Sequence, residues 1–182
     1  MDDESARRRI LDASDELFYE NGIRAVGMDA IRDASGVSLK RLYRLYPAKD
    51  RLAEAMLRRR AEAFREAVVA HAAGRGSPHE QILAVFDFLY DWFSEPDFRG
   101  CPFINAFGEA HRGGVMDSVA DQKRDLERVL DDLVAAAGGP KTLGRQLLIL
   151  ANGAMVTAAI LDSPDAALQA KDAARALLDA SL

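Results

Sequence analysis

Apolar residues recur at three- and four-residue spacing along most of the chain, and this period predicts amphipathic α-helices. In residues 5–20, Ile10 and Phe18 belong to such a stripe. Asn21 and Gly22 follow it, and glycine commonly ends a helix because it adopts left-handed backbone angles without strain. The first element is therefore expected to be an amphipathic helix that packs on the residues after it.

The same period, interrupted by glycine, proline and serine, predicts eight more helices. Their expected ranges are 28–35, 38–45, 49–72, 78–93, 102–110, 115–137, 141–161 and 164–180. Ser77, Pro78 and Glu80 form a clear start signal, with a capping serine, a proline in the first turn and a glutamate placed to close a capping box. No alternating strand pattern is convincing, so an all-α fold of nine helices is predicted.

The gap between the second and third predicted helices leaves room only for a tight turn at Gly36 and Val37. Ile31, Val37 and Leu42 are the apolar anchors that would hold these two short helices against the first. We therefore predict a helix-turn-helix unit and, without a flexible linker, a larger helical domain. They comprise residues 1–47 and residues 48–182.

The distribution of charge supports this organisation. Of the 182 residues, 49% are apolar, and the helix formers Ala, Leu, Arg and Glu are frequent. The net charge is −5, but residues 1–60 carry net +2 and residues 61–182 carry net −7. Residues 36–60 hold eight Lys and Arg against two acidic residues. Positive charge is thus concentrated around the tight turn, where phosphate binding would need it.

Several classes of protein are disfavoured by the composition. Residues 1–4 are acidic, and no long uncharged apolar stretch follows, which fits neither a secretory signal nor a membrane span. We therefore expect a cytoplasmic protein without a membrane partner. Cys101 is the only cysteine, which excludes an internal disulfide and a multi-cysteine metal site. His71, His79 and His111 lack metal-ligand spacing, so no metal or cofactor is inferred.

The second short helix has the composition of a DNA-recognition helix. Ser38 can cap it, and Gly36 allows a tight turn before it, while Tyr46 is expected in the core. Lys and Arg can donate to guanine O6 and N7, a leucine can contact a thymine methyl, and a tyrosine or a lysine at a helix start can reach phosphate. The residues expected to contact DNA are Ser38, Leu39, Lys40, Arg41, Tyr43, Arg44 and Lys49.

Four segments together resemble the signature of the TetR family of transcriptional regulators. They are Gly36-Val37-Ser38, Leu42-Tyr43-Arg44, Tyr46-Pro47 and residues 49–52. The similarity covers residues 7–57, with the first helix at the matching distance. It implies an all-α homodimer whose two recognition helices enter successive major grooves of a palindromic double-stranded DNA operator. It also implies repression that a small-molecule ligand relieves.

Some charged and polar positions leave alternatives open. Residues 26–28 stand where family members often have a threonine, which leaves that position without a hydroxyl for phosphate. Arg32 stands where alanine is usual, and it either replaces that phosphate contact or is a solvated surface charge. The arginine runs at 7–9 and 58–60 either steer the protein to phosphates or form solvated helix faces.

A cluster of large apolar residues in the second domain could line the cavity of a small-molecule site. Its members are Phe86, Leu89, Tyr90, Trp92, Phe93, Phe103, Ile104, Phe107 and Met116. Asn105, Glu109 and His111 would add polar groups for a partly apolar ligand. Residues 100–105 also resemble a segment found in a subset of TetR-type regulators. For any one of these residues, a place in the protein core is the alternative.

The last two predicted helices carry a stripe of leucines and alanines whose size would allow two helices to approach closely. This stripe predicts a homodimer built as a four-helix bundle. The residues expected at its interface are Leu143, Leu147, Ala151, Ala154, Ala158, Ala174 and Leu177. The alternative is that the stripe packs only within the subunit.

The chain carries no G-x-S-x-G, H-E-x-x-H, Walker A or Rossmann glycine pattern, so we do not expect an enzyme. The predicted function is a ligand-responsive, DNA-binding repressor. Two alternatives stay open. One is a helical ligand-binding or catalytic protein that retains the helix-turn-helix as a structural element, and the other is a DNA-binding protein without a ligand.

Overall fold

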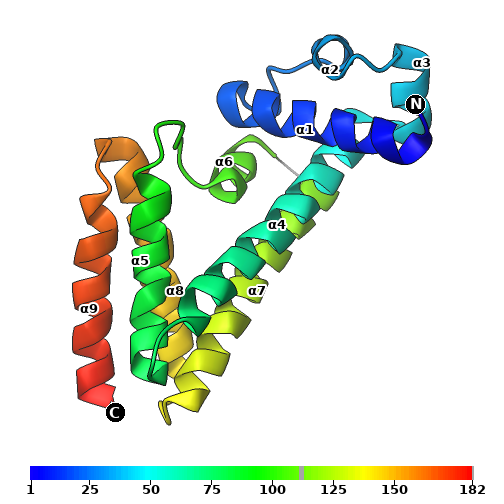
Figure 1. Ribbon diagram of the computed structural model, residues 1–182. Helices are drawn as coiled ribbons and strands as arrows, with labels where there is room; N and C mark the ends of the chain where they lie inside the picture. Colours follow the sequence, from blue (N-terminus) through cyan, green and yellow to red (C-terminus); the bar gives the residue numbers. More distant parts are fainter. Residues whose placement is uncertain (111–112, 182) are drawn as a thin grey trace. The chain divides into compact units, whose positions relative to one another are not determined.

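The computed structural model describes residues 1–110 and 113–181, and every regular element within these residues is an α-helix (Figure 1). The helices are α1 (Asp3–Asn21), α2 (Met28–Ser35), α3 (Leu39–Leu45), α4 (Lys49–Ala73), α5 (Pro78–Phe93), α6 (Pro102–Glu109), α7 (Gly114–Ala136), α8 (Thr142–Leu161) and α9 (Asp165–Ser181). Each lies within two residues of its expected bounds. The prediction of an all-α chain is confirmed.

Local capping explains where several helices begin and end. At α5 the capping box is complete, because the Glu80 backbone N–H donates to Ser77 Oγ at 3.2 Å and the Ser77 backbone N–H donates to Glu80 Oε2 at 2.9 Å. α1 begins two residues earlier than expected because Asp2 caps it, accepting the Ser5 N–H at 2.7 Å. Gly22 ends α1 with a φ of 84°, as its position predicted.

The chain divides into two compact units. Unit 1 comprises Met1–Ala61 and Pro102–Asp121, and unit 2 comprises Glu62–Cys101 and Gln122–Leu182. The expected boundary after residue 47 does not coincide with this division. The reason is that the first turns of α4 bury Leu52, Met56 and Leu57 within unit 1. Where one function ends and the other begins along the chain stays a prediction.

Unit 1 is built on α1. Helices α2 and α3 contact α1 and each other, and α1, α4 and α6 together line a small cavity of about 20 Å³, room for about one water molecule. Phe18, Leu57 and Ala106 are among its lining residues, one from each helix. The start of α4 and all of α6 are therefore part of the body that carries the helix-turn-helix.

Unit 2 holds α5, α8 and α9 side by side (Figure 1). Its core includes Phe86 and Leu89 of α5 and Leu143 of α8, each at most 1% exposed. Gly144 of α8 allows a close approach to α7, since a Cβ there would lie 3.2 Å from the Cα of Asp131. A side chain at this position would also meet the Asp131 carboxylate, so both that carboxylate and the neighbouring backbone of α7 would have to shift.

The stripe predicted to form the dimer interface lies inside unit 2. Six of its members are buried and Leu177 is half-buried. The buried members are Leu143, Leu147, Ala151, Ala154, Ala158 and Ala174. Six of the seven expected interface residues are therefore already covered within the subunit, where α5, α8 and α9 pack together, and the interface itself stays a prediction.

The opposite side of α8 is also apolar. Ile149 is 63% exposed, Val156 38% and Ile160 74%, at positions that fall on one face of a helix. By length and composition alone α8 would be apolar enough to cross a membrane, yet 44% of that stretch is buried within the protein. Two apolar faces on one helix account for this composition.

Candidate nucleic-acid interface

Buried apolar side chains fix the turn between α2 and α3. Ile31, Val37 and Leu42 are each at most 1% exposed, as the spacing predicted. Gly36 caps α2 with a φ of 64°, and a Cβ there would lie 2.8 Å from Nη2 of Arg9. The left-handed angle favours glycine at this position. α3 is thus presented as a short, firmly seated helix.

The outer face of α3 carries the side chains that the sequence predicted for DNA. Lys40, Tyr43 and Arg44 are exposed, and Leu39 and Arg41 are half-buried. Tyr46 is 6% exposed and belongs to the core, also as predicted. The face is therefore a row of three cations, one phenol and one aliphatic group over one and a half turns of helix.

Ser38 occupies the N-cap position of α3, but its side chain makes no capping hydrogen bond. Its backbone carbonyl instead accepts from the N–H groups of Arg41 and Leu42, each at 2.9 Å. The prediction that the Ser38 side chain caps the helix is wrong. Ser38 is exposed, so its side chain is accessible to solvent.

Two of these cations share one carboxylate. Arg41 donates through Nε and Nη2 to Oδ1 of Asp3 at 3.1 and 2.8 Å. Arg44 donates through Nη1 to Oδ2 at 2.8 Å and through Nη2 to Oδ1 at 2.6 Å. The hydrogen bonds from Arg44 and then from Arg41 hold the pKa of Asp3 far below its usual range. Asp3 lies 38 and 41 residues away in sequence, and nothing in the pattern pointed to it.

Lys49 is placed differently from the prediction. Its Nζ donates to the backbone carbonyls of Ile23 at 2.9 Å, Arg24 at 3.2 Å and Val26 at 3.1 Å. An ammonium group has three N–H donors, and these contacts use all of them. The expected phosphate contact of Lys49 is therefore corrected. Lys49 secures the loop between α1 and α2 instead.

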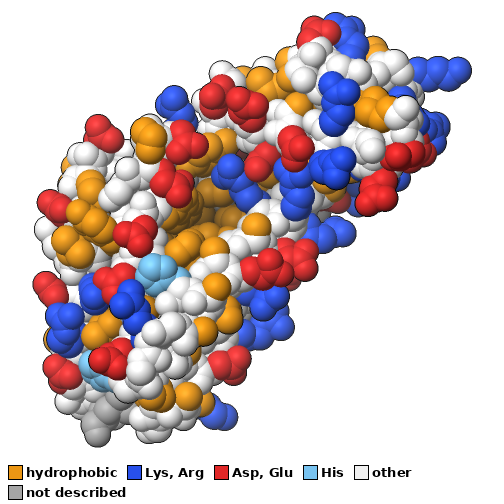
Figure 2. Space-filling view, viewed as in Figure 1, with side chains coloured by type: hydrophobic (Ala, Val, Ile, Leu, Met, Phe, Trp, Pro, Cys, Tyr) orange, Lys and Arg blue, Asp and Glu red, His pale blue; other side chains and the backbone are white. Residues whose placement is uncertain are grey.

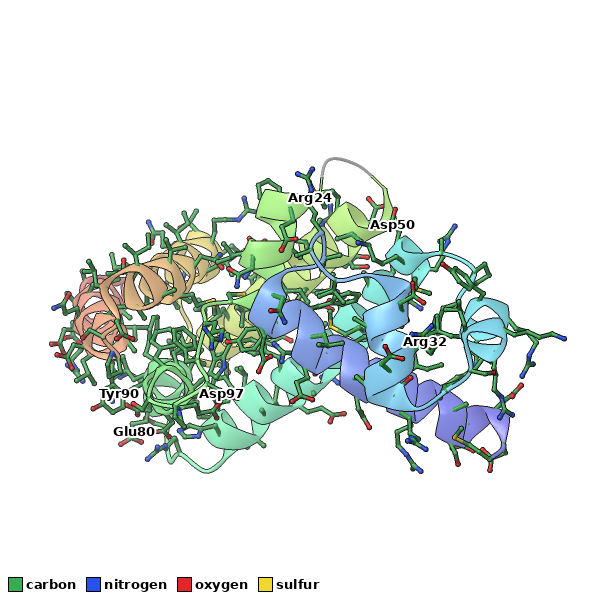
Figure 3. All side chains as sticks on the ribbon, turned by 90° about the horizontal axis from the view of Figure 1, so that it is seen from above. Arg24, Arg32, Asp50, Glu80, Tyr90 and Asp97 are labelled. Carbon is green, nitrogen blue, oxygen red and sulfur yellow. The ribbon has the colours of Figure 1, made fainter. Side chains whose placement is uncertain are left out.

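Glu109, at the end of α6, binds a backbone N–H group of the same loop. Its Oε2 accepts the Arg24 N–H at 2.7 Å, and a Cβ on Gly22 would lie 2.9 Å from its Oε1. Glu109 and Lys49 also line a hollow of about 270 Å³ in unit 1, beside the loop and the start of α4, where Arg24 and Asp50 are marked (Figure 3). Sequence reasoning placed Glu109 near a ligand and missed this role.

The remaining charges of unit 1 are largely engaged with neighbours. Arg59 pairs with Asp12 at 2.6 Å, and Arg60 pairs with Asp15 at 2.6 Å and lies 4.4 Å over the Tyr19 ring. These contacts join α4 to α1 and favour the structural interpretation of two residues in the 58–60 run. Arg58 is exposed.

Two further arginines nearer the turn are also paired. Arg32 on α2 (Figure 3) forms ion pairs with Asp29 at 2.8 Å and Asp33 at 2.7 Å. Arg7 lies 5.5 Å over the Tyr46 ring, at the end of α3. Acidic side chains thus lie among the basic ones over α1 to α3 (Figure 2). Fewer cations are therefore available to a ligand on this surface than the number of arginines in the sequence indicated.

The residues predicted for a ligand site are distributed over both units. Phe86, Leu89 and Phe93 are buried in unit 2, at 5% exposure or less, while Tyr90 and Trp92 are half-buried. Four others belong to unit 1: Phe103 is buried, Phe107 is 57% exposed, and Ile104 and Met116 are half-buried. The expected single cluster is therefore divided, because residues 102–121 pack with the N-terminal helices.

Of the three polar groups expected near the ligand, Asn105 and Glu109 line cavities in unit 1, and His111 lies outside the described residues. Unit 2 contains a series of aromatic rings in edge contact. The ring centroid of Phe64 lies 5.5 Å from those of both Phe88 and Trp92, and the ring centroids of Trp92 and Phe98 are 5.3 Å apart. These rings form the aromatic group of unit 2.

Comparison with known proteins agrees with this geometry. The family model described as bacterial regulatory proteins, tetR family, matches residues 10–56. The structure of SCO4454, a TetR-family transcriptional regulator from Streptomyces coelicolor, has 28% sequence identity and a TM-score of 0.87, covering 97% of this chain and 95% of that one. The chain belongs to the TetR family. Its residues 10–56 accordingly match the segment that the bacterial tetR-family regulatory proteins share.

Two other relatives add detail. The HTH-type transcriptional activator FasR of Mycolicibacterium smegmatis is 32% identical over 125 residues, which cover 63% of this chain and 57% of FasR. The chain therefore spans little more than half the length of that relative. E. coli NemR in its reduced form has 19% identity and a TM-score of 0.85, covering 93% of this chain and 95% of NemR, which shows a shared fold.

The Lys49 contacts make a prediction about stability in this TetR-family protein. Lys49→Met should lower the free energy of unfolding by about 1–3 kcal/mol, because the loop carbonyls lose a charged donor. Lys40→Met, which removes an exposed ammonium from α3, should change it by less than about 0.5 kcal/mol. Urea unfolding followed by circular dichroism measures both. Equal losses of unfolding free energy for the two variants would contradict this role of Lys49.

Proposed function

We propose that this regulator binds a palindromic operator as a homodimer, with one α3 in each of two successive major grooves, and that a small partly apolar ligand releases it. The observation that carries the proposal is the outer face of α3, with Leu39, Lys40 and Tyr43 beside Arg41 and Arg44, on a helix anchored by buried residues. Rigid presentation of base-reading side chains is what a recognition helix requires.

Each group on this face has a chemical role at DNA. Arg41, Arg44 and Lys40 supply donors for guanine O6 and N7, and Leu39 supplies an apolar contact for a thymine methyl. The hydroxyls of Ser38 and Tyr43 suit phosphate oxygens, which set position rather than sequence. Lys49 contributes to DNA binding only indirectly, because it binds the loop that precedes α2.

Dimerisation is supported by the exposed side of α8. Monomeric proteins rarely leave a contiguous apolar face on a helix open to water. Ile149, Val156 and Ile160 form such a face, and Leu161 and Leu168, 68% and 41% exposed, are further exposed leucines of α8 and α9. We propose that this face, rather than the buried stripe, meets its counterpart in a second copy of the chain around a two-fold axis.

Ligand control is supported by the aromatic group of unit 2. A ligand alters DNA binding only if it has different affinities for two states of the dimer. α4 begins in unit 1 at Lys49 and continues into unit 2, where it contributes Phe64 to the aromatic group. It is the element we propose to carry the response. FasR is named an activator, and we propose repression here because of the family resemblance.

DNA binding is tested by a mobility shift with DNA flanking the gene. Wild type should give a specific shift, and Arg41→Ala should weaken it about tenfold or more, because a base or phosphate contact is lost. Arg58→Ala removes an exposed cation from α4 and serves as the control, with an effect expected within about twofold. The proposal fails if wild type gives no specific shift, or if the two variants behave alike.

The oligomeric state tests the face on α8. Wild type should sediment as a dimer, and Ile160→Asp should sediment as a monomer, because a carboxylate would be buried without a partner. Val69→Asp, on α4 at 41% exposure, places the same charge on an apolar surface position outside α8 and should leave the dimer intact. A dimeric Ile160→Asp, or a monomeric wild type, would refute this interface.

A fluorescent apolar anion, 8-anilinonaphthalene sulfonate, tests for a ligand site beside the aromatic group. Its binding should quench the emission of Trp92, the only tryptophan, and should saturate. Phe88→Ala should weaken that binding about fivefold or more by removing contact area, and Phe107→Ala, an exposed residue of unit 1, should not. Without saturable binding, a DNA-binding protein lacking a ligand becomes the better description.

A further inference from the structure

Asp3 stands where nucleic acid would meet α3. Its carboxylate accepts four hydrogen bonds from Arg41 and Arg44, at 2.6 to 3.1 Å. The Asp3 side chain is 45% exposed and that of Arg44 is 56% exposed, so the ion pairs lie at the surface of the unit. Of the three cations on the outer face of α3, two are therefore occupied by one anion of the same chain.

The first turn of α1, which carries Asp3, is held in place by its own contacts. Asp2 caps α1 through the Ser5 N–H at 2.7 Å, which fixes the first turn. Ala6 and Ile10, in the next turns, are fully buried. Asp3 also lies in the first turn of α1, where the helix dipole favours a negative charge. Its position is thus set by helix packing and capping rather than by the ion pairs alone.

We infer that Asp3 is a specificity-determining residue: it competes with DNA phosphates for Arg41 and Arg44 and so weakens binding to DNA that lacks the operator sequence. This inference rests on the proposed contact of α3 with DNA. A carboxylate and a phosphate present the same paired oxygens to a guanidinium. When the DNA offers only phosphates, replacing the Asp3 carboxylate with a phosphate as the partner of these arginines therefore stabilises the complex little.

An operator offers more than phosphate. Guanine O6 and N7 accept hydrogen bonds from a guanidinium, and neighbouring bases fit Leu39 and Lys40 at the same time. The sum of these contacts offsets the loss of the Asp3 ion pairs only at a matching sequence. Asp3 thus acts by penalising incorrect partners, which is a recognised route to specificity.

The charge of Asp3 persists throughout the conditions in which DNA binding is measured. The guanidiniums of Arg44 and Arg41 lower the pKa of Asp3, so the carboxylate stays ionised at neutral pH. Asp3 also lowers the net charge of this cluster to +1, from the +2 of the two arginines alone. Fewer counterions are then released when α3 approaches a phosphate backbone, and sequence-independent affinity falls accordingly.

The first turn of α1 supplies a matched control. Glu4 follows Asp3 directly and is exposed. Glu4→Gln and Asp3→Asn remove the same charge from the same helix end, so they alter the helix dipole interaction and the net charge equally. Only Asp3→Asn releases Arg41 and Arg44. Any difference between the two variants therefore reports on the arginines.

The experiment measures affinity by fluorescence anisotropy for two duplexes of equal length. One is the sequence that wild type selects from a random pool, and the other is its scrambled version. At several salt concentrations, Asp3→Asn should bind the scrambled duplex about five- to tenfold more tightly, with a salt dependence steeper by about one charge. Binding to the selected duplex should change less, so the ratio of the two affinities falls. Glu4→Gln should stay within about twofold of wild type on both duplexes.

The outcomes separate the inference from the proposed function. If wild type selects no sequence and prefers neither duplex, the proposed operator binding is wrong. If wild type discriminates but Asp3→Asn and Glu4→Gln bind alike, the inference alone is wrong. A loss of affinity for the selected duplex with no gain on the scrambled one would also overturn it, since Asp3 would then only position the arginines. Asp3→Glu retains a carboxylate and should restore most of the discrimination, and thermal unfolding checks that each variant is folded.

Discussion

The ammonium of Lys49 binds three carbonyls of the loop between α1 and α2, and this contact joins the start of α2 to α4. Backbone carbonyls in a turn need donors, and here Ile23, Arg24 and Val26 obtain them from a single side chain. Glu109 binds an N–H of the same loop. The loop is thereby connected to both α4 and α6, so the start of α2 is determined by residues well outside the helix-turn-helix.

Charge in this protein acts mainly by pairing. Arg32, Arg59 and Arg60 all form ion pairs with carboxylates in unit 1. Even on α3, two of the three cations are held by Asp3. A count of positive residues therefore overstates the field that DNA would meet, and what distinguishes the outer face of α3 is the arrangement of a few exposed donors on a rigid helix.

α8 illustrates how one helix serves two surfaces. Leucines and alanines on one side pack against α5 and α9, and Ile149, Val156 and Ile160 lie on the other. Periodicity cannot assign such a helix, because both faces are apolar and only the tertiary contacts show which one is already covered. The same limit applied to Phe86, Leu89 and Phe93, which the sequence could not distinguish from core residues and which the fold buries.

The sequence by itself determined the all-α fold, the helix bounds to within two residues, the tight turn at Gly36 and the outer face of α3. These features are local: helix period, capping and turn chemistry act over a few residues. The tertiary structure alone decided the partners of Lys49, Glu109 and Asp3 and the covered face of α8. The contacts of Lys49, Glu109 and Asp3 join residues that are separated by 23 to 85 positions in the sequence. The covered face of α8 depends on which of its two apolar faces another helix packs against. Neither kind of contact leaves a periodic signal along the chain.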